Sequence, residues 1–245
     1  MKNVILIVAG DPNSINTEII AKVWKRIDNS LKKKIYLLGN FNLIKNQLKK
    51  LNKKILLQSV KKIDQSYINN KLKIIDVPLS FAKPFKVNHA NASKYIIKCL
   101  NLSHKLAKSN EVKGMINCPI DKSLISKSRN KGVTEFLALK CGIKNSSEVM
   151  LIHNKKLSVL PLTTHIRLKD VSKKISKTLI EKKINTLQVN YKKIFKKKPR
   201  LGVLGLNPHN AEFTKDSEEF KIIVPTISKL RKKGYSVFGP ISSDT

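Results

Sequence analysis

The chain has 245 residues, enough to bury a sizeable core as one large α/β domain or as two smaller lobes. It carries 50 Lys and Arg against 16 Asp and Glu, a formal net charge of +34. The excess is almost entirely lysine spread along the whole chain, whereas arginine, the better ligand for phosphates and base edges, is scarce. Compositional drift therefore explains the charge better than a nucleic-acid surface does, and we do not expect nucleic acid among the partners.

The cysteines and the N-terminal residues bear on where the protein works. Cys99, Cys118 and Cys141 have no metal-type spacing and their number is odd, which suits a reducing cytoplasm. The apolar run at residues 4–10 is too short for a signal peptide, and no apolar stretch approaches the roughly 20 residues of a membrane span. We therefore expect a cytoplasmic protein without a membrane segment.

In the first half of the chain, apolar runs typical of strands alternate with amphipathic patterns typical of helices. Strands are expected at residues 4–10, 34–39, 54–60, 72–77 and 112–117, and helices at about 17–27, 41–51 and 91–107. Alternation of this kind predicts an α/β fold with a mostly parallel sheet and helices on both faces.

The second half continues the alternation. The runs at 148–154 and 157–165 predict successive strands, which the turn-like segment 154–156 would allow to pair. A helix over about 171–194, a strand at 200–206, a helix over about 217–232 and a strand at 235–239 follow. The chain stops shortly after this last strand, where a parallel sheet would usually continue.

Polar residues follow several of these strand-like runs. Ligands of an open parallel sheet bind beyond the carboxyl ends of its strands, so a site is expected there. The residues in question are Asp11 after the first run, Asn117 and Lys122 after 112–117, His165 after 157–162, Asn207, His209 and Glu212 after 200–206, and Asp244 after 235–239. Five strand ends with a charged or polar group are more than turn chemistry requires.

His165 and His209 are the candidate metal ligands. Read singly, each histidine would be a turn or capping residue. Two neutral imidazoles at one sheet edge can bind a divalent transition metal, but two ligands make an incomplete site, to which Asp244 could contribute. We therefore expect a metal site that includes both histidines.

Thr134 and Lys122 are the candidates for binding an anionic group. The segment "NKGVTEFLALKCG" predicts a short helix capped by Thr134, whose hydroxyl could meet an anionic substrate at the helix N-terminus. Lys122 could add a compact positive charge for a phosphate and is a candidate catalytic residue. The sequence contains no G-x-G-x-x-G and no Walker A motif, so a standard dinucleotide or P-loop site is not supported.

Taken together, the motifs resemble the 4-hydroxythreonine-4-phosphate dehydrogenase family of vitamin B6 biosynthesis. The motifs "PLTTHIRLKDV" and "GLNPHNAE" are the specific matches, and "GDPNSINTEII", "NCPIDKSLI", "GVTEFLA", "DSEEFKIIVPTI" and "GPISSDT" support them in the family's order. The resemblance covers the whole chain. It implies one enzyme chain, residues 1–245, of two interleaved α/β/α lobes around a cleft, similar to the isocitrate and isopropylmalate dehydrogenases.

The resemblance also implies the chemistry and the partners. The family oxidises and decarboxylates 4-phosphooxy-L-threonine to 3-amino-2-oxopropyl phosphate with NAD or NADP and a divalent metal (Zn, Mg, Co or Mn), which polarises the oxidised oxygen. It works as a homodimer. His165 and His209 would be two of three metal histidines, Thr134 would contact the substrate, and Asp244 would lie in the site. Asn207 and Glu212 would orient the metal ligands.

The sequence departs from the family pattern at several places, and two of these bear most on function. Val133 stands where the family has a substrate-contacting histidine, which favours a related dehydrogenase for another phosphorylated hydroxy acid. The family also continues beyond the position of Thr245 with a third metal histidine and further substrate ligands. C-terminal elements of the fold are therefore expected to be missing, as in a fragment or a degraded relative. An inactive relative that serves as a binding protein is the third alternative.

Overall fold

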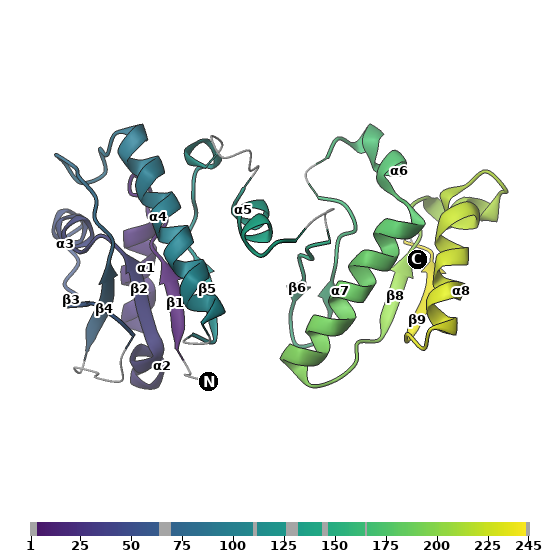
Figure 1. The fold of residues 1–245 in the computed structure, drawn as a ribbon, viewed down its shortest axis with the longest axis horizontal. Coiled ribbons are helices and arrows are strands. Elements are labelled where there is room, and N and C mark those ends of the chain that lie inside the picture. The colour runs from purple at the N-terminus through teal and green to yellow at the C-terminus, as the bar shows by residue number, and fades with distance from the viewer. Residues whose placement is uncertain are drawn as a thin grey trace. The chain divides into compact units, whose positions relative to one another are not determined.

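The computed structural model describes residues 4–63, 70–109, 112–125, 132–143, 147–164 and 166–243. The chain divides into two compact units, Met1–Gly142 and Ile143–Thr245, which are described separately (Figure 1). Each unit is a continuous segment of the chain. The two interleaved lobes that the resemblance implies stay a prediction.

A five-stranded sheet forms the centre of unit 1, and all of its strand pairs are parallel. The strand order is β3-β4-β2-β1-β5. The strands are β1 (Ile5–Val8), β2 (Ile35–Gly39), β3 (Leu56–Val60), β4 (Lys71–Asp76) and β5 (Gly114–Asn117). All five expected runs of the first half are strands, so the α/β class and the parallel sheet predicted from the sequence are confirmed.

Helices cover both faces of this sheet (Figure 1). The helices of unit 1 are α1 (Asn16–Arg26), α2 (Asn29–Lys34), α3 (Phe41–Lys50), α4 (His89–Lys108) and α5 (Val133–Lys140), with a 3-10 turn, η1, at Lys122–Leu124. Successive side chains of a strand point to opposite faces. Leu6, Tyr36 and Leu38 accordingly pack against α4, and Leu37 packs with Trp24 of α1 and Leu48 of α3 on the other face.

Unit 2 contains two small sheets. The pair β6 (Ile152–His153) and β7 (Ser158–Val159) is antiparallel, which confirms the pairing expected for these two runs, and β8 (Leu201–Leu204) pairs in parallel with β9 (Val237–Ile241). The helical elements are η3 (Leu168–Asp170), α6 (Val171–Lys174), α7 (Lys177–Phe195), η4 (Pro208–Phe213), η5 (Glu219–Ile223) and α8 (Val224–Lys232). Within the described residues, no helix is both long and apolar enough to cross a membrane.

Two helices of unit 2 differ from the predictions. The single helix expected over 171–194 is interrupted at Ile175, which is extended and buried, and Ser176 then caps α7 by accepting a hydrogen bond from the Leu179 amide. The helix expected over 217–232 begins with the π-helical turn η5. Pro225 lies in the first turn of α8 and has no amide hydrogen to continue the regular α-helical ladder backwards.

Candidate functional site

The end of β8 is closed by a buried carboxylate. The backbone amides of Leu206 and Asn207 donate to Oε1 of Glu219 at 2.7 and 2.8 Å. The Asn207 side-chain amide donates to Glu219 Oε2 at 2.9 Å and to Glu218 Oε2 at 3.0 Å. Glu219 is fully buried. Hydrogen bonds from the backbone and from the Asn207 side chain therefore both fix the turn that leads from β8 to Pro208 and His209.

Glu219 is held in its ionised form. Burial alone would raise the pKa of this carboxyl, but the hydrogen bonds from Asn207 and from the Leu206 amide favour the charged form and lower the pKa below its ordinary value. Hydrogen bonds to an ionised acceptor are stronger than neutral ones. The donors that surround Glu219 are consequently matched to an anion.

The chain beyond Pro208 has an unusual backbone. Residues 209–213 all have positive φ, between 47° and 56°, so they form one left-handed turn. For non-glycine residues this conformation costs about 1–2 kcal/mol each. A conformation of this cost persists only where the surrounding structure enforces it, and such segments concentrate at functional sites. The turn exposes His209 and Glu212 and buries Asn210.

Gly205 lies directly beneath this turn. A Cβ atom at Gly205 would be 2.1 Å from Oδ1 of Asn210 and 3.3 Å from Oε1 of Glu219. The Oδ1 atom of Asn210 is buried and has no hydrogen-bond partner among the described residues. The end of β8 can thus approach the left-handed turn only because residue 205 has no side chain.

Only one of the predicted metal ligands can be placed. His165 and Asp244 lie outside the described residues, and within the described part of the chain no three His, Cys, Asp or Glu side chains are grouped as a metal site. His209 follows β8 and is exposed. Imidazole and carboxylate are ligands that suit Zn, Co or Mn. The residue types predicted from the sequence thus have the chemistry of ligands for a divalent metal, and the centre itself stays a prediction.

Glu212 and Asn207, expected to orient the metal ligands, differ in their surroundings. Asn207 makes the contacts with Glu218 and Glu219 described above. Glu212 is exposed on the left-handed turn, and its predicted role stays a prediction. Glu218 and Glu219 were not among the residues predicted from the sequence, although two adjacent acids are conspicuous in a chain with only 16 Asp and Glu.

In unit 1, Thr134 is not the helix cap that the sequence predicted. Gly132 occupies the N-cap position, and Thr134 is the exposed second residue of α5. The side chain of Glu135 reaches back to the N-cap, where its Oε2 lies 3.0 Å from the position of a Gly132 Cβ. Val133 is half-buried and packs against the hydrophobic core on the α4 face. Thr134 can still present its hydroxyl to a ligand, and that role stays a prediction.

Lys122 begins η1, beyond the carboxyl end of β5, and is exposed. Asp121 caps this turn by accepting a hydrogen bond from the Ser123 amide at 2.9 Å, and this bond lowers the pKa of the Asp121 carboxyl. The turn therefore displays the Lys122 ammonium at the sheet edge where ligands bind in parallel α/β sheets. A catalytic role for Lys122 stays a prediction.

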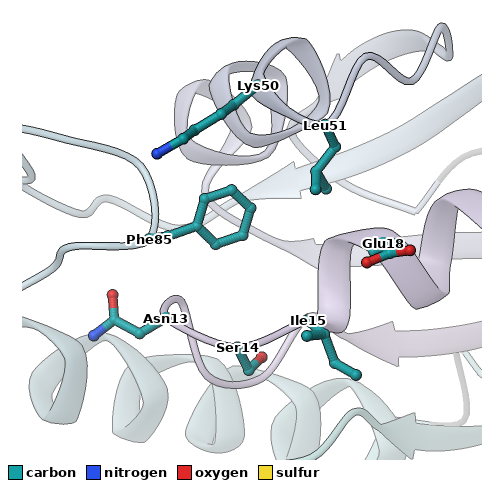
Figure 2. A pocket seen from close by; sticks show the side chains of 7 residues that line it. All are labelled: Asn13, Ser14, Ile15, Glu18, Lys50, Leu51 and Phe85. Carbon is teal, nitrogen blue, oxygen red and sulfur yellow. The ribbon is translucent and has the colours of Figure 1, made fainter.

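A pocket opens beside the loop that joins β1 to α1. Its volume is about 310 Å³, and its lining residues are Asn13, Ser14, Ile15, Glu18, Lys50, Leu51 and Phe85 (Figure 2). Phe85 has a φ of 64°, which is unfavourable for a bulky side chain, and Lys50 Nζ lies 5.9 Å from the centre of its ring. Asn13 fixes the Phe85 segment by exchanging two hydrogen bonds of 2.8 Å with the Val87 backbone.

The walls of this pocket suit a flat, partly apolar ligand. Ile15, Leu51 and the Phe85 ring are apolar, while Asn13, Glu18 and Lys50 supply polar groups at the edges (Figure 2). Drug-sized ligands occupy pockets of about 300–1,000 Å³, so this pocket has room for one ring of a dinucleotide but not for the whole cofactor. No cofactor-binding residue was predicted from the sequence. Phe85 could not be recognised there, because its backbone conformation cannot be read from its residue type.

Comparison with known proteins agrees with the resemblance seen in the motifs. Residues 12–245 match the family described as pyridoxal phosphate biosynthetic protein PdxA. The 4-hydroxythreonine-4-phosphate dehydrogenase of Aquifex aeolicus is 30% identical over 252 residues, which cover 100% of this chain and 75% of that protein. A Salmonella typhi relative named for D-threonate 4-phosphate is 27% identical, over 98% of this chain and 75% of its own length.

A solved structure shares the fold. The crystal structure of 4-hydroxythreonine-4-phosphate dehydrogenase from Klebsiella pneumoniae superposes with a TM-score of 0.87 at 26% identity, over 99% of this chain and 76% of that one. The mixed α/β fold with a parallel sheet is thus that of a dehydrogenase of known structure. From its match to the family across residues 12–245, the chain belongs to the pyridoxal phosphate biosynthetic protein PdxA family of oxidoreductases.

Proposed function

We propose that the protein catalyses the metal-dependent, NAD(P)-linked oxidative decarboxylation of 4-phosphooxy-L-threonine to 3-amino-2-oxopropyl phosphate in vitamin B6 biosynthesis. The observation that carries the proposal is the match to the family, which includes the segment that ends in His209. The left-handed turn with its exposed histidine supports it, because a costly backbone conformation at a strand end indicates a functional constraint.

The reaction balances without a further reactant. The C3 hydroxyl of the substrate loses its proton and C3 transfers a hydride to the nicotinamide, which leaves a β-keto acid. The bond between C2 and the carboxylate then breaks, carbon dioxide leaves, and the electron pair passes to the enol, which is protonated at C2. A bound divalent metal would supply Lewis acidity toward the oxygen at C3 in both steps.

Each residue has a role in this proposal. His209, together with His165, would hold the metal, and the Asn207 contacts would keep the turn in place. Lys122 would bring a positive charge to the phosphate, and Thr134 a hydroxyl to the substrate. Asp244 would act as a catalytic carboxylate. The pocket of Asn13 and Phe85 would receive one ring of NAD(P), because its apolar walls and volume match a single flat ring.

Turnover of the purified chain tests the assignment. We expect NADH to form from 4-phosphooxy-L-threonine and NAD only with an added divalent metal such as Co²⁺, and His209→Ala to lower kcat/KM at least a hundredfold. His153→Ala is the matched control, since His153 is an exposed histidine of the same unit that contacts Ser158. Unchanged turnover in His209→Ala would refute the assignment, and an inactive wild-type chain would favour the binding-protein alternative.

A second substrate class is favoured by two observations. A relative of similar coverage is named for D-threonate 4-phosphate, and Val133 is turned toward the core where the resemblance expects a substrate-contacting histidine. D-threonate 4-phosphate differs from 4-phosphooxy-L-threonine by a hydroxyl in place of the amine at C2, and the same chemistry would yield dihydroxyacetone phosphate. The ratio of kcat/KM for the two substrates decides between them.

The resemblance also leads us to propose a homodimer. Sedimentation equilibrium of the purified chain tests this directly, with a mass of twice the 27.7 kDa of one chain as the expected result. A species of 27.7 kDa at every concentration would count against it.

A further inference from the structure

We infer that Glu219 is a positioning residue for the metal ligand His209. Its buried carboxylate fixes the exit from β8 and thereby sets where the His209 imidazole lies. The inference rests on the proposed function, because it takes His209 to be a metal ligand.

Both carboxylate oxygens of Glu219 accept hydrogen bonds from the residues that directly follow β8. One oxygen of Glu219 accepts from two consecutive backbone amides, those of Leu206 and Asn207, and the other accepts from the Asn207 side chain. Glu219 is fully buried, and the residues that donate to it are half-buried.

Only Pro208 separates this anchored residue from His209. The proline ring fixes its own φ, so the chain has few free rotations between Asn207 and the histidine. Beyond Pro208 the chain enters the left-handed turn of residues 209–213, in which the buried Asn210 packs against Gly205. The histidine is therefore held from both sides, by Glu219 before it and by Asn210 after it.

Neither neighbouring acid can replace Glu219 in this role. Glu212 is nearer in sequence to His209, but it is exposed. Glu218 is half-buried and accepts a hydrogen bond of 3.0 Å from the Asn207 side chain. Among the acids in the described part of the chain, Glu219 alone accepts from both the backbone amides and the side chain of this turn.

Glu219→Gln tests the inference with Co²⁺ alone as the probe. A glutamine oxygen can still accept from the two backbone amides, but its NH₂ group would face the NH₂ group of Asn207, donor against donor. We expect at least tenfold weaker Co²⁺ binding, since loss of a group that supports a metal ligand commonly costs 10–100-fold in affinity. Hydrogen exchange at the Leu206 and Asn207 amides should accelerate, and kcat should fall while KM for NAD is unchanged.

A rescue and a control separate positioning from general damage. The rescue is one triple variant that combines Glu218→Gln, Glu219→Gln and Asn207→Asp. In it the two glutamine NH₂ groups can donate to the new carboxylate at position 207, so the side-chain contacts form again with donor and acceptor exchanged. We expect the Co²⁺ affinity to return to within about threefold of wild type. The control is Glu181→Gln, which removes a carboxylate paired with Lys229 at 2.8 Å elsewhere in the same unit. It should leave Co²⁺ affinity within twofold of wild type.

The outcomes are distinct for the two proposals. If His209→Ala loses Co²⁺ but Glu219→Gln binds it as wild type does while the two amides exchange faster, the positioning role is wrong and the proposed function stands. Equal losses of Co²⁺ affinity in Glu181→Gln and Glu219→Gln would also overturn the positioning role, because general destabilisation would then explain both losses. If the wild-type chain binds no Co²⁺, or His209→Ala binds it equally well, the proposed function fails and the inference fails with it.

Discussion

Two turns of the molecule use the same packing device. In unit 1, residues 9–15 connect β1 to α1, and a Cβ at Gly10 would lie 2.6 Å from Nδ2 of the buried Asn16, the first residue of α1. In unit 2, a Cβ at Gly205 would lie 2.1 Å from Oδ1 of the buried Asn210. Each strand end thus places a glycine against a buried asparagine, which lets the chain reverse tightly.

The two turns differ in how their polar groups are satisfied. The Asn16 amide donates to the carbonyl oxygens of Ala9 and Pro119 at 3.0 and 2.8 Å, so neutral groups hold the turn of unit 1. An ionised carboxylate, Glu219, holds the turn of unit 2. Hydrogen bonds to an ionised carboxylate are stronger than those to a neutral group, so the turn of unit 2 holds the proposed metal ligand His209 more firmly than neutral groups would. The stability of this turn then depends on pH.

The largest predicted effect is the alkaline sensitivity of unit 1, where the Cys99 thiol and the Tyr95 phenol are buried. Burial raises the pKa of the Cys99 thiol from 9.0 to about 12 and also raises the pKa of Tyr95. Above about pH 9 the unfolded thiol loses its proton while the folded one keeps it, so stability falls as pH rises. The loss approaches about 4 kcal/mol by pH 12, at about 1.4 kcal/mol for each of three pH units.

Trp24 reports on this transition. It is the one tryptophan in the sequence and is buried in unit 1, so its fluorescence during urea unfolding follows that unit. Cys99→Ala should flatten the fall between pH 9 and pH 11, whereas Cys141→Ala, which changes an exposed thiol, should not. An equally steep fall in Cys99→Ala would show that Cys99 is not the group responsible.

Unit 2 should show the opposite dependence. The pKa of Glu219 is lowered, so its contribution to stability is present above its ordinary value of 4.5 and is lost as pH falls below that value through the folded pKa. Wild type should therefore lose more stability than Glu219→Gln between pH 5 and pH 3, as measured by circular dichroism during urea unfolding. A wild-type loss no larger than that of Glu219→Gln would mean that the charge does not stabilise the turn.

Gly205→Ala should break the turn of unit 2 by sterics alone. The new methyl group would meet Asn210 Oδ1 at 2.1 Å, and overpacking of this kind costs about 1–3 kcal/mol. Gly114→Ala is the matched control, because a Cβ there meets nothing within 4 Å. We expect thermal unfolding to show a clear loss only in Gly205→Ala, and similar melting temperatures of the two variants would contradict the close packing.

The sequence predicted the elements better than the contacts between them. The five strands of unit 1 were found because their apolar runs are short and bounded by turns, which is local information. The left-handed turn was not, since five non-glycine residues in that conformation oppose local preference. The role of Glu219 depends on a contact 12 residues away in sequence, between Asn207 and a carboxylate on η5, which only the tertiary fold creates.

Phe85→Leu gives the smallest predicted effect and separates the functions of the two turns. Leucine keeps the Cβ atom and the strained backbone of Phe85 but removes the ring and its contact with Lys50, so the change tests the contribution of the ring. Aromatic stacking contributes about 0.5–1.5 kcal/mol, so KM for NAD should rise about 2–12-fold. Co²⁺ affinity should be unchanged, whereas Glu219→Gln should change Co²⁺ affinity and leave KM for NAD alone.

Steady-state kinetics and Co²⁺ titration of both variants measure this. A Phe85→Leu variant that lost Co²⁺ affinity but kept its KM for NAD would contradict the assignment of the Phe85 pocket to NAD(P). The pocket beside the β1–α1 loop would then influence metal binding and not cofactor binding.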